Sequence, residues 1–294
     1  HAVDGVSLKI AKGEVVGLVG ESGCGKSTLG RMVAGILEPT AGAIHYKGNL
    51  VSAMDKDAGH KTALAIQMIF QDPFASLNPR MRVQDIIGEA PVRHGIVTKA
   101  GAADYVAEVM RRVGLDPDYR RRYPHQFSGG QRQRIGIARA LAVNPEFLVC
   151  DEAIAALDVS IQAQVINLFM DLREDLDLTY LFISHDLSVV EHISDRVVIM
   201  YLGRVVETAS TEDIFASPNH PYTQALLNEV PRLDIRGLDY QPISGEIPSP
   251  LDPPPGCHFH PRCPHATARC REERPKLREI APGRIAACHL NDSP

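Results

Sequence analysis

The chain has 294 residues, of which 44% are hydrophobic and 23% charged, and its formal net charge at pH 7 is -5. This length accommodates a sizeable core with an appendage, and by itself it predicts about two domains. The negative charge balance excludes a general nucleic-acid binder, whose binding face would be basic. No run approaches the roughly eighteen apolar residues of a membrane helix, so we expect any membrane association to come through partners.

The first elements predicted along the chain are two strands and a helix. Val6, Leu8 and Ile10 alternate with polar residues, which predicts a half-exposed antiparallel strand. The run from Glu14 to Val19 is apolar and rich in valine, as in a buried parallel strand. Helix-compatible spacing continues through residues 27–34.

A glycine-rich segment, GESGCGKST, lies between that parallel strand and that helix and matches the pattern G-x-x-x-x-G-K-[ST]. In this pattern the backbone N–H groups surround phosphate oxygens, Lys26 reaches the terminal phosphates and Ser27 ligates magnesium. The strand, loop and helix supply the required context, so the segment predicts nucleotide binding. Its residues are Gly20, Glu21, Ser22, Gly23, Cys24, Gly25, Lys26, Ser27 and Thr28.

A second glycine motif, FSGGQ, precedes a segment in which apolar residues recur at helical spacing. Ser128 takes the place of a helix N-cap, and a helix N-terminus of this kind offers N–H donors and a positive dipole end to a phosphate. An ordinary capped helix after a turn is the alternative interpretation of this motif alone. The residues concerned are Ser128, Gly129, Gly130 and Gln131.

Taken in chain order, these and the later motifs resemble the ATP-binding-cassette (ABC) family over essentially the whole chain. The resemblance makes GESGCGKST the Walker A motif and FSGGQ the signature, in place of the commoner LSGGQ. Gln71 is then the Q-loop residue, FLVCD with Glu152 is Walker B, Asp158 lies in the D-loop and His185 is the switch histidine.

The family fold implied by this resemblance is an α/β P-loop NTPase with an antiparallel β subdomain and a helical subdomain at about residues 72–145. In that family two cassettes pack head to tail, so each ATP lies between the Walker A motif of one subunit and the signature and D-loop of the other. We therefore expect a lone copy of the chain to hydrolyse ATP poorly.

The chemistry of phosphoryl transfer assigns roles to the acidic and polar groups of these motifs. Asp151, at the end of an apolar strand, is placed to hold Mg²⁺ through water, and the adjacent Glu152 is the expected general base. His185 follows an apolar run at the expected end of another parallel strand, where open α/β sheets gather their ligands, and we expect it to contact the γ-phosphate. Gln71 can ligate Mg²⁺ and sense the γ-phosphate.

Departures from the family pattern occur after Walker B and at the start of the chain. Ala153 stands where the family usually has proline, and Ala155 where it often has serine. Both acidic groups remain, so we expect modest effects on rate. The family's adenine-stacking aromatic residue normally lies just upstream of a start such as HAVDGVSLKI, so we expect it to be missing from this sequence.

The chain after His185 is predicted to complete the catalytic domain, residues 1–210, and then to form an extension, residues 211–294. Arg196–Met200 and Arg204–Thr208 are predicted strands, and residues 211–216 and 221–229 are predicted helices. Prolines between Pro242 and Pro255 then predict a segment without regular structure.

Most of the chain's cysteines fall in its last forty residues, in a segment too poor in apolar residues to build its own core. An ATPase of this type works in a reducing cytosol, which disfavours disulfides, whereas four thiolates suit an iron–sulfur cluster or zinc. Structural zinc sites usually show C-x-x-C spacing, and its absence here favours the cluster. A segment that binds no metal is the third alternative. The expected ligands are Cys257, Cys263, Cys270 and Cys288, with His258, His260, His265 and His289 as possible zinc ligands. Cys24 and Cys150 are expected to be small buried or loop residues, Cys24 being open to alkylation.

The segments NHPYT and GEIPSPLDPPPGCHFHPRCP are similar to the C-terminal extension of the oligopeptide and dipeptide importer ATPases, a branch that also contains nickel and glutathione importers. In that branch the four-cysteine motif is associated with a [4Fe-4S] cluster. The resemblance implies an ATP- and Mg²⁺-dependent subunit on the cytoplasmic face of a bacterial inner membrane. Its expected partners are two permeases, a second and non-identical ATPase, and an extracytoplasmic substrate-binding protein, with no nucleic acid.

Two other classes of protein share part of this pattern. A soluble ABC ATPase of DNA repair or translation would require a long coiled-coil insertion or two cassettes, and neither is present in the sequence. A P-loop kinase would have no use for the FSGGQ motif or for a switch histidine at position 185.

Overall fold

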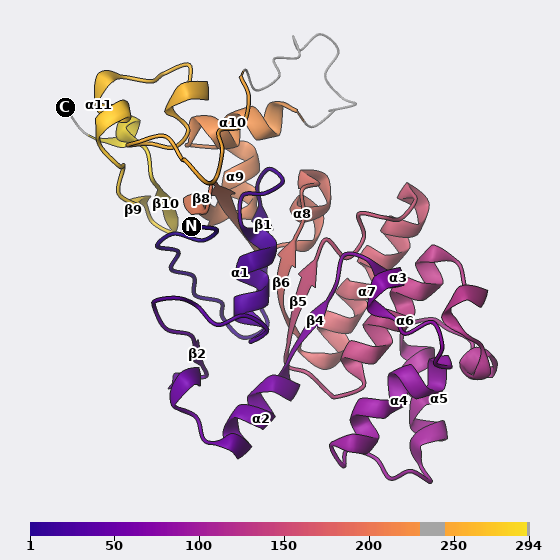
Figure 1. The fold of residues 1–294 in the computed structure, drawn as a ribbon. Coiled ribbons are helices and arrows are strands. Elements are labelled where there is room, and N and C mark those ends of the chain that lie inside the picture. The colour runs from indigo at the N-terminus through magenta and orange to yellow at the C-terminus, as the bar shows by residue number, and fades with distance from the viewer. Residues whose placement is uncertain (230–244, 293–294) are drawn as a thin grey trace. The chain divides into compact units, whose positions relative to one another are not determined.

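The computed structural model describes residues 1–229 and 245–292. The chain forms two compact units, of which the first comprises residues 1–10, 14–29 and 182–294 and the second residues 11–13 and 30–181. Figure 1 labels the helices and strands with the names used below. Pro242, where the proline-rich segment was predicted to begin, lies outside the described residues, and residues 245–259 contain no helix or strand.

The first unit is built on strands in the order β1-β7-β8-β10-β9. Strand β1 (Val15–Val19) is buried throughout and pairs in parallel with β7 (Arg196–Tyr201), which confirms the predicted buried parallel strand. Strand β8 (Arg204–Ser210) pairs antiparallel with both β7 and β10. The remaining elements of this unit are α8 (Leu187–Ile193), α9 (Thr211–Ala216), α10 (Pro221–Asn228), η4 (His260–Arg262), α11 (Ala268–Glu272), β9 (Arg278–Ala281), β10 (Arg284–Ala286) and η5 (His289–Asn291).

The second unit carries most of the helices in the described part of the chain. Strands β4 (Ile66–Ile69) and β5 (Phe147–Asp151) pair in parallel, with Ile69 opposite Cys150. The other elements are β2 (His45–Tyr46), β3 (Asn49–Leu50), η1 (Val51–Ala53), α2 (Lys56–Ala65), α3 (Pro73–Ser76), α4 (Val83–Arg93), α5 (Ala102–Arg112), η2 (Pro117–Arg121), η3 (Pro124–Gln126), α6 (Gly129–Leu141) and α7 (Val159–Leu176). The boundary between the units falls within α1 (Lys26–Val33) and β6 (Thr179–Ile183).

The predicted strand around Val6, Leu8 and Ile10 is wrong, because the described residues before β1 contain no strand. These three side chains are half-buried and their polar neighbours exposed, so the alternation in the sequence does report burial. The backbone of this segment makes isolated contacts instead of a ladder. Asp4 N donates to Gly203 O at 2.8 Å, and Lys9 O accepts from Arg196 Nη2 at 2.5 Å.

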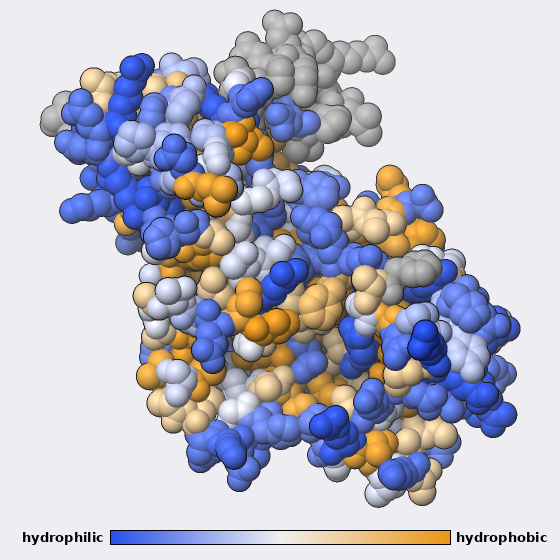
Figure 2. All heavy atoms as spheres, in the orientation of Figure 1, coloured by the Kyte–Doolittle hydropathy of each residue, from blue (hydrophilic) through white to orange (hydrophobic). Residues whose placement is uncertain are grey.

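The extension joins the core of the first unit through Phe259, which is 1% exposed. The Phe259 ring lies 5.3 Å from the rings of both Tyr201 and Tyr222. Burying a side chain of this size contributes about 1.5–3 kcal/mol. On the face shown in Figure 2 the surface over α11, β9 and β10 is mostly hydrophilic. The extension therefore shares a core that it has too few apolar residues to build alone.

Candidate functional site

The glycine-rich loop of the first unit connects β1 to α1 and needs glycine at two positions because other backbone segments approach it closely. A Cβ atom on Gly20 would lie 2.2 Å from Met200 O, and one on Gly25 would lie 2.1 Å from Ala2 O. Gly25 also has a φ of +102°, a region that side chains disfavour. Close backbone neighbours thus restrict the shape of the loop, and the convergence of its N–H groups on phosphate stays a prediction.

Lys26, the first residue of α1, is 4% exposed and lies over this loop. Its Nζ donates to Gly20 O at 2.6 Å and to Glu21 O at 3.1 Å. The ammonium group is therefore bonded to carbonyl oxygens of the loop itself, and its contact with phosphate stays a prediction.

Cys24 lies in the same loop with its Sγ 3.9 Å from Lys26 Nζ. The thiol is buried, and burial raises its pKa although the charge of Lys26 acts in the opposite direction. Cys24 is thus a buried loop residue, as predicted. Because the thiolate is the reactive form, this arrangement disfavours the alkylation that the sequence suggested.

Glu21 is held by residues of the C-terminal part of the chain, a contact that sequence reasoning missed. Arg262 Nη1 and Nη2 donate to Glu21 Oε2 and Oε1 at 2.7 and 2.9 Å. The backbone N–H of Glu21 donates to the Tyr222 hydroxyl at 2.9 Å. Tyr222 and Arg262 lie in the two segments that resemble the C-terminal extension of the importer ATPases. That resemblance says nothing of a contact with the loop, so the sequence carried no signal for it.

His185 also belongs to the first unit and follows the end of β6 by two residues. Its side chain is exposed. The next residue, Asp186, caps α8 by accepting from Ser188 N at 2.9 Å. The predicted position after a strand end is therefore confirmed, and the contact with a γ-phosphate stays a prediction.

The second unit brings Gln71 and Glu152 together. Gln71 Nε2 donates to Glu152 Oε2 at 2.7 Å. Ile69 and Cys150 are opposite each other in the parallel pair of β4 and β5, so the two strands end at the same edge of the sheet. Gln71 lies two positions after Ile69, and Glu152 lies two positions after Cys150. Asp151, the last residue of β5, is buried, and Glu152 has a φ of 46°. A glutamate in this left-handed region is uncommon and is often found at functional sites.

The FSGGQ segment begins α6 with a capping box, as predicted for Ser128. Ser128 Oγ accepts from Gln131 N at 3.3 Å, and Gln131 Oε1 accepts from Ser128 N at 3.0 Å. The capping box does not use the N–H groups of Gly129 and Gly130, which agrees with the proposed phosphate contact.

Gly130 also has a packing role that sequence reasoning missed. A Cβ on Gly130 would lie 2.5 Å from Ile161 Cγ2 in α7. Asp158, the D-loop residue, precedes α7 directly, and its carbonyl oxygen accepts from Ile161 N at 2.9 Å and from Gln162 N at 2.8 Å. The signature and D-loop residues thus stand at the beginnings of two helices of the same unit.

The four cysteines of the extension are half-buried in the first unit, and Cys257 N donates to Cys270 O at 2.9 Å. Burial raises the pKa of the Cys257 thiol to about 11, and the other three thiols act in the same direction. Within residues 1–229 and 245–292, no group of three or more His, Cys, Asp or Glu side chains is arranged to hold a metal ion. A metal at these cysteines stays a prediction.

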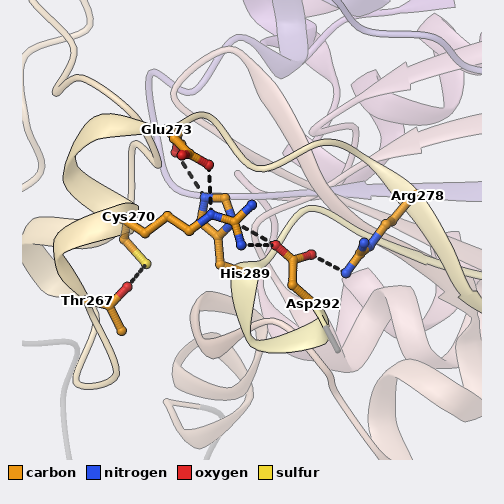
Figure 3. Close-up of polar contacts among 7 residues, drawn as sticks. Thr267, Cys270, Glu273, Arg278, His289 and Asp292 are labelled. Carbon is orange, nitrogen blue, oxygen red and sulfur yellow. Dashed lines mark hydrogen bonds and ion pairs between the residues drawn. The ribbon is translucent and has the colours of Figure 1, made fainter. Parts of the chain in front are cut away.

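Polar contacts of the extension occupy several of its histidines, and Figure 3 shows those of His289. His289 Nδ1 lies 3.1 Å from Asp292 Oδ2, and its Nε2 lies 3.0 Å from Glu273 O. His260 Nδ1 lies 2.9 Å from Cys257 O, and His258 Nδ1 lies 3.3 Å from Leu202 O. His289 therefore has both ring nitrogens engaged, which removes it as a zinc ligand in this arrangement.

Comparisons with known proteins cover most of the chain. A family model described as ABC transporter matches residues 3–155, and one described as Oligopeptide/dipeptide transporter, C-terminal region, matches residues 206–270. The chain is 54% identical to the Oligopeptide transport ATP-binding protein AppF of Bacillus subtilis, over 98% of this chain and 89% of that protein. It is 49% identical to the Dipeptide transport ATP-binding protein DppF of Haemophilus influenzae, over 98% and 88% of the two chains.

Solved structures of similar fold include ATP-binding cassettes. cbiO1 from Clostridium perfringens, part of the ABC transporter complex cbiONQ, matches with a TM-score of 0.66 and 28% identity over 74% of this chain and 85% of its own. The ATP-binding cassette MJ0796, bound to ADP and Pi in a dimeric post-hydrolysis state, matches with a TM-score of 0.64 and 28% identity over 71% and 90%. No helix in the described ranges of this chain is long and apolar enough to cross a membrane.

Proposed function

Because this chain belongs to the ABC transporter family, we propose that it is the ATP-hydrolysing subunit of an importer that carries peptides across a bacterial cytoplasmic membrane. The observation that carries the proposal is the match to peptide-importer ATPases over 98% of the chain, extension included. The match of residues 206–270 to the C-terminal region of oligopeptide and dipeptide transporters supports the same substrate class.

The phosphate loop and Lys26 bind the nucleotide, in this proposal. Lys26 reaches the terminal phosphates with an ammonium group that already donates to two carbonyl oxygens of the loop. Ser27, Gln71 and Asp151 are the proposed magnesium ligands, because hydroxyl, amide and carboxylate oxygens suit this ion. The Gln71 amide nitrogen is already bonded to Glu152, which leaves its oxygen to serve as the ligand atom. When bound, Mg²⁺ neutralises negative charge on the phosphates.

Glu152 accepts the proton of the attacking water, and His185 contacts the γ-phosphate, in the same proposal. The signature residues Ser128, Gly129, Gly130 and Gln131, together with Asp158, act on the nucleotide of a second cassette. The capping box supports this role, because it fixes the N-terminus of α6 without using the two glycine N–H groups.

We assign two permeases, a second ATPase and an extracytoplasmic binding protein as partners, with this subunit on the cytoplasmic face of the membrane. What supports this assignment is that the chain is similar to subunits named for peptide transport. The same partners would serve a nickel or glutathione importer, so substrate identity requires a transport measurement.

The test is to isolate the intact complex through a tag on this chain, identify its subunits and reconstitute it with its binding protein in proteoliposomes. We expect dipeptides or oligopeptides to stimulate ATP hydrolysis and to be taken up. If only nickel or only glutathione stimulates ATP hydrolysis, that compound and not peptide is the substrate. A complex without membrane subunits would refute the transport function.

We also propose Cys257, Cys263, Cys270 and Cys288 as ligands of a [4Fe-4S] cluster, with zinc as the alternative. The donor set supports this proposal, since four thiolates suit either centre. The arrangement of the described side chains does not fit a metal as it stands, so binding would require the thiols to move and deprotonate. Anaerobic purification with metal analysis and a visible absorption spectrum tests it; absence of both iron and zinc would refute it.

A further inference from the structure

The C-terminal extension contacts the phosphate loop through Glu21. Arg262 makes two parallel hydrogen bonds to the Glu21 carboxylate, of 2.7 and 2.9 Å, and Tyr222 accepts from the Glu21 backbone N–H. The pattern G-x-x-x-x-G-K-[ST] permits any residue at this second position, so phosphate binding alone does not explain a glutamate. Its carboxylate serves the extension.

Arg262 is held firmly enough to fix its partner. Its side chain is 4% exposed, whereas that of Arg111, in an ion pair with Glu108 on α5, is 60% exposed. Its Nη1 also donates to the Tyr201 hydroxyl at 3.4 Å, and its guanidinium carbon lies 6.0 Å from the centre of the Phe259 ring. Phe259 belongs to the core cluster that contains Tyr201 and Tyr222. Phe259, three positions before Arg262, thus anchors this segment in the core.

Glu21 in turn contacts the lysine of the loop. Its carbonyl oxygen accepts from Lys26 Nζ at 3.1 Å. A displacement of the Glu21 backbone therefore moves the carbonyl oxygen that accepts from Lys26 Nζ. It also moves the backbone N–H groups that flank Glu21 in the loop. The contacts form a continuous path from Arg262 through Glu21 to Lys26.

We propose that Arg262 is a positioning residue for ATP: by fixing Glu21 it holds the phosphate loop in its binding shape, and it makes nucleotide affinity depend on the folded extension. Because coupling between two sites is reciprocal, bound nucleotide also stabilises the segment around Arg262. The inference rests on the proposed function only for the identity of the ligand that the loop binds.

Binding of AMP-PNP with Mg²⁺ to the full chain, measured by calorimetric titration, tests the proposal. We expect Arg262→Gln and Glu21→Gln each to weaken binding about fivefold or more. The double variant should bind no more weakly than the weaker single variant, because both changes remove one interaction. Arg262→Lys should recover part of the affinity, since lysine supplies the charge without the two-pronged geometry.

Arg269→Gln is the matched control, because it removes the same charge from the same extension. Arg269 is 51% exposed in its side chain and pairs with Glu273 and Asp292, which are both labelled in Figure 3. We expect its AMP-PNP affinity to equal that of the unmodified chain. An equal loss in this variant would show a general effect of charge and would overturn the proposal.

A second readout separates positioning from stability. The Arg262 amide donates to Phe259 O at 3.0 Å, and AMP-PNP should slow its hydrogen exchange in the unmodified chain but not in Glu21→Gln, which changes no residue of the extension. Should Arg262→Gln fail to fold, Glu21→Gln decides the matter. Unchanged affinity in Glu21→Gln, or strictly additive losses in the double variant, would overturn the proposal.

The same titration keeps the inference apart from the proposed function. Unchanged AMP-PNP affinity in Lys26→Ala would refute the loop as the nucleotide site, and with it the function. A large loss in Lys26→Ala with normal affinity in Arg262→Gln and Glu21→Gln would overturn the inference alone.

Discussion

Gln71 donates its amide N–H to Glu152 at 2.7 Å, and the two residues leave adjacent parallel strands at the same edge. The bond engages one carboxylate oxygen of Glu152 and so limits the rotamers of its side chain. With a backbone φ of 46°, Glu152 is also constrained along the chain. A general base must be aimed at its water before reaction, so these two constraints would serve the role proposed for Glu152.

Glu152→Gln should retain nucleotide binding and reduce ATP turnover by about 100-fold or more, since the amide keeps the size of the side chain but cannot accept a proton. Phosphate release from the reconstituted transporter measures the effect. Glu146→Gln is the control, because Glu146 precedes the same strand, pairs with Lys47 and should leave turnover unchanged. Normal turnover in Glu152→Gln would refute the assigned base.

Gly130→Ala should destabilise the chain by about 1–3 kcal/mol, because the added methyl group meets Ile161 Cγ2 at 2.5 Å and a β-branched side chain in a helix has little freedom to move. The midpoint of urea unfolding measures this. At Gly129 the added Cβ would lie 3.8 Å from Leu157, an ordinary contact, so Gly129→Ala is the matched control. Equal midpoints in the two variants would contradict the packing role of Gly130.

Stability should fall on acidification because of His220. Burial lowers the pKa of His220 to about 4, whereas an unfolded histidine titrates near 6.5. Above pH 6.5 neither state binds the proton, and between pH 6.5 and 4 only the unfolded state does, so stability is lost there by up to about 3 kcal/mol. The neutral ring is required because Nδ1 accepts from Tyr222 N at 3.0 Å.

His220→Asn tests this origin, since asparagine can still cap α10 but does not titrate. We expect its unfolding midpoint in urea to change less between pH 7 and pH 5 than that of the unmodified chain. His192→Asn, at an exposed position of α8, should keep the full pH dependence. An identical pH dependence in His220→Asn would contradict the assignment.

Cys24 should resist alkylation in the folded chain, because it is 3% exposed and burial raises the pKa of its thiol. We expect iodoacetamide at neutral pH to modify it slowly until urea unfolds the chain, as followed by mass spectrometry of the loop peptide. The unfolded sample is the control for intrinsic reactivity. Rapid native labelling at Cys24 would show that the loop opens more readily than its close contacts imply.

The parts of the site that could be predicted from sequence are those encoded by neighbouring residues. The phosphate loop, the cap at Ser128 and the strand ending at Asp151 each follow from a short pattern with a local physical cause. The position of Gln71 beside Glu152 could be anticipated only through the family resemblance, because a lone glutamine carries no pattern.

Contacts between distant parts of the chain could not be predicted in this way. Glu21 and Arg262 are 241 positions apart, and neither belongs to a periodic pattern. The alternation at residues 6–10 reported half-burial correctly but not hydrogen bonding, since burial on one side does not require a neighbouring strand. The packing of Gly130 on Ile161 likewise depends on how two helices cross.

The bonds from Lys26 to Gly20 O and Glu21 O hold the ammonium group in the loop before any nucleotide arrives. An ammonium group has three N–H donors, so it can contact a phosphate oxygen while it keeps the bond to Glu21 O. The loop is thereby prepared in advance for ATP, and rapid-mixing kinetics should show binding as a single step.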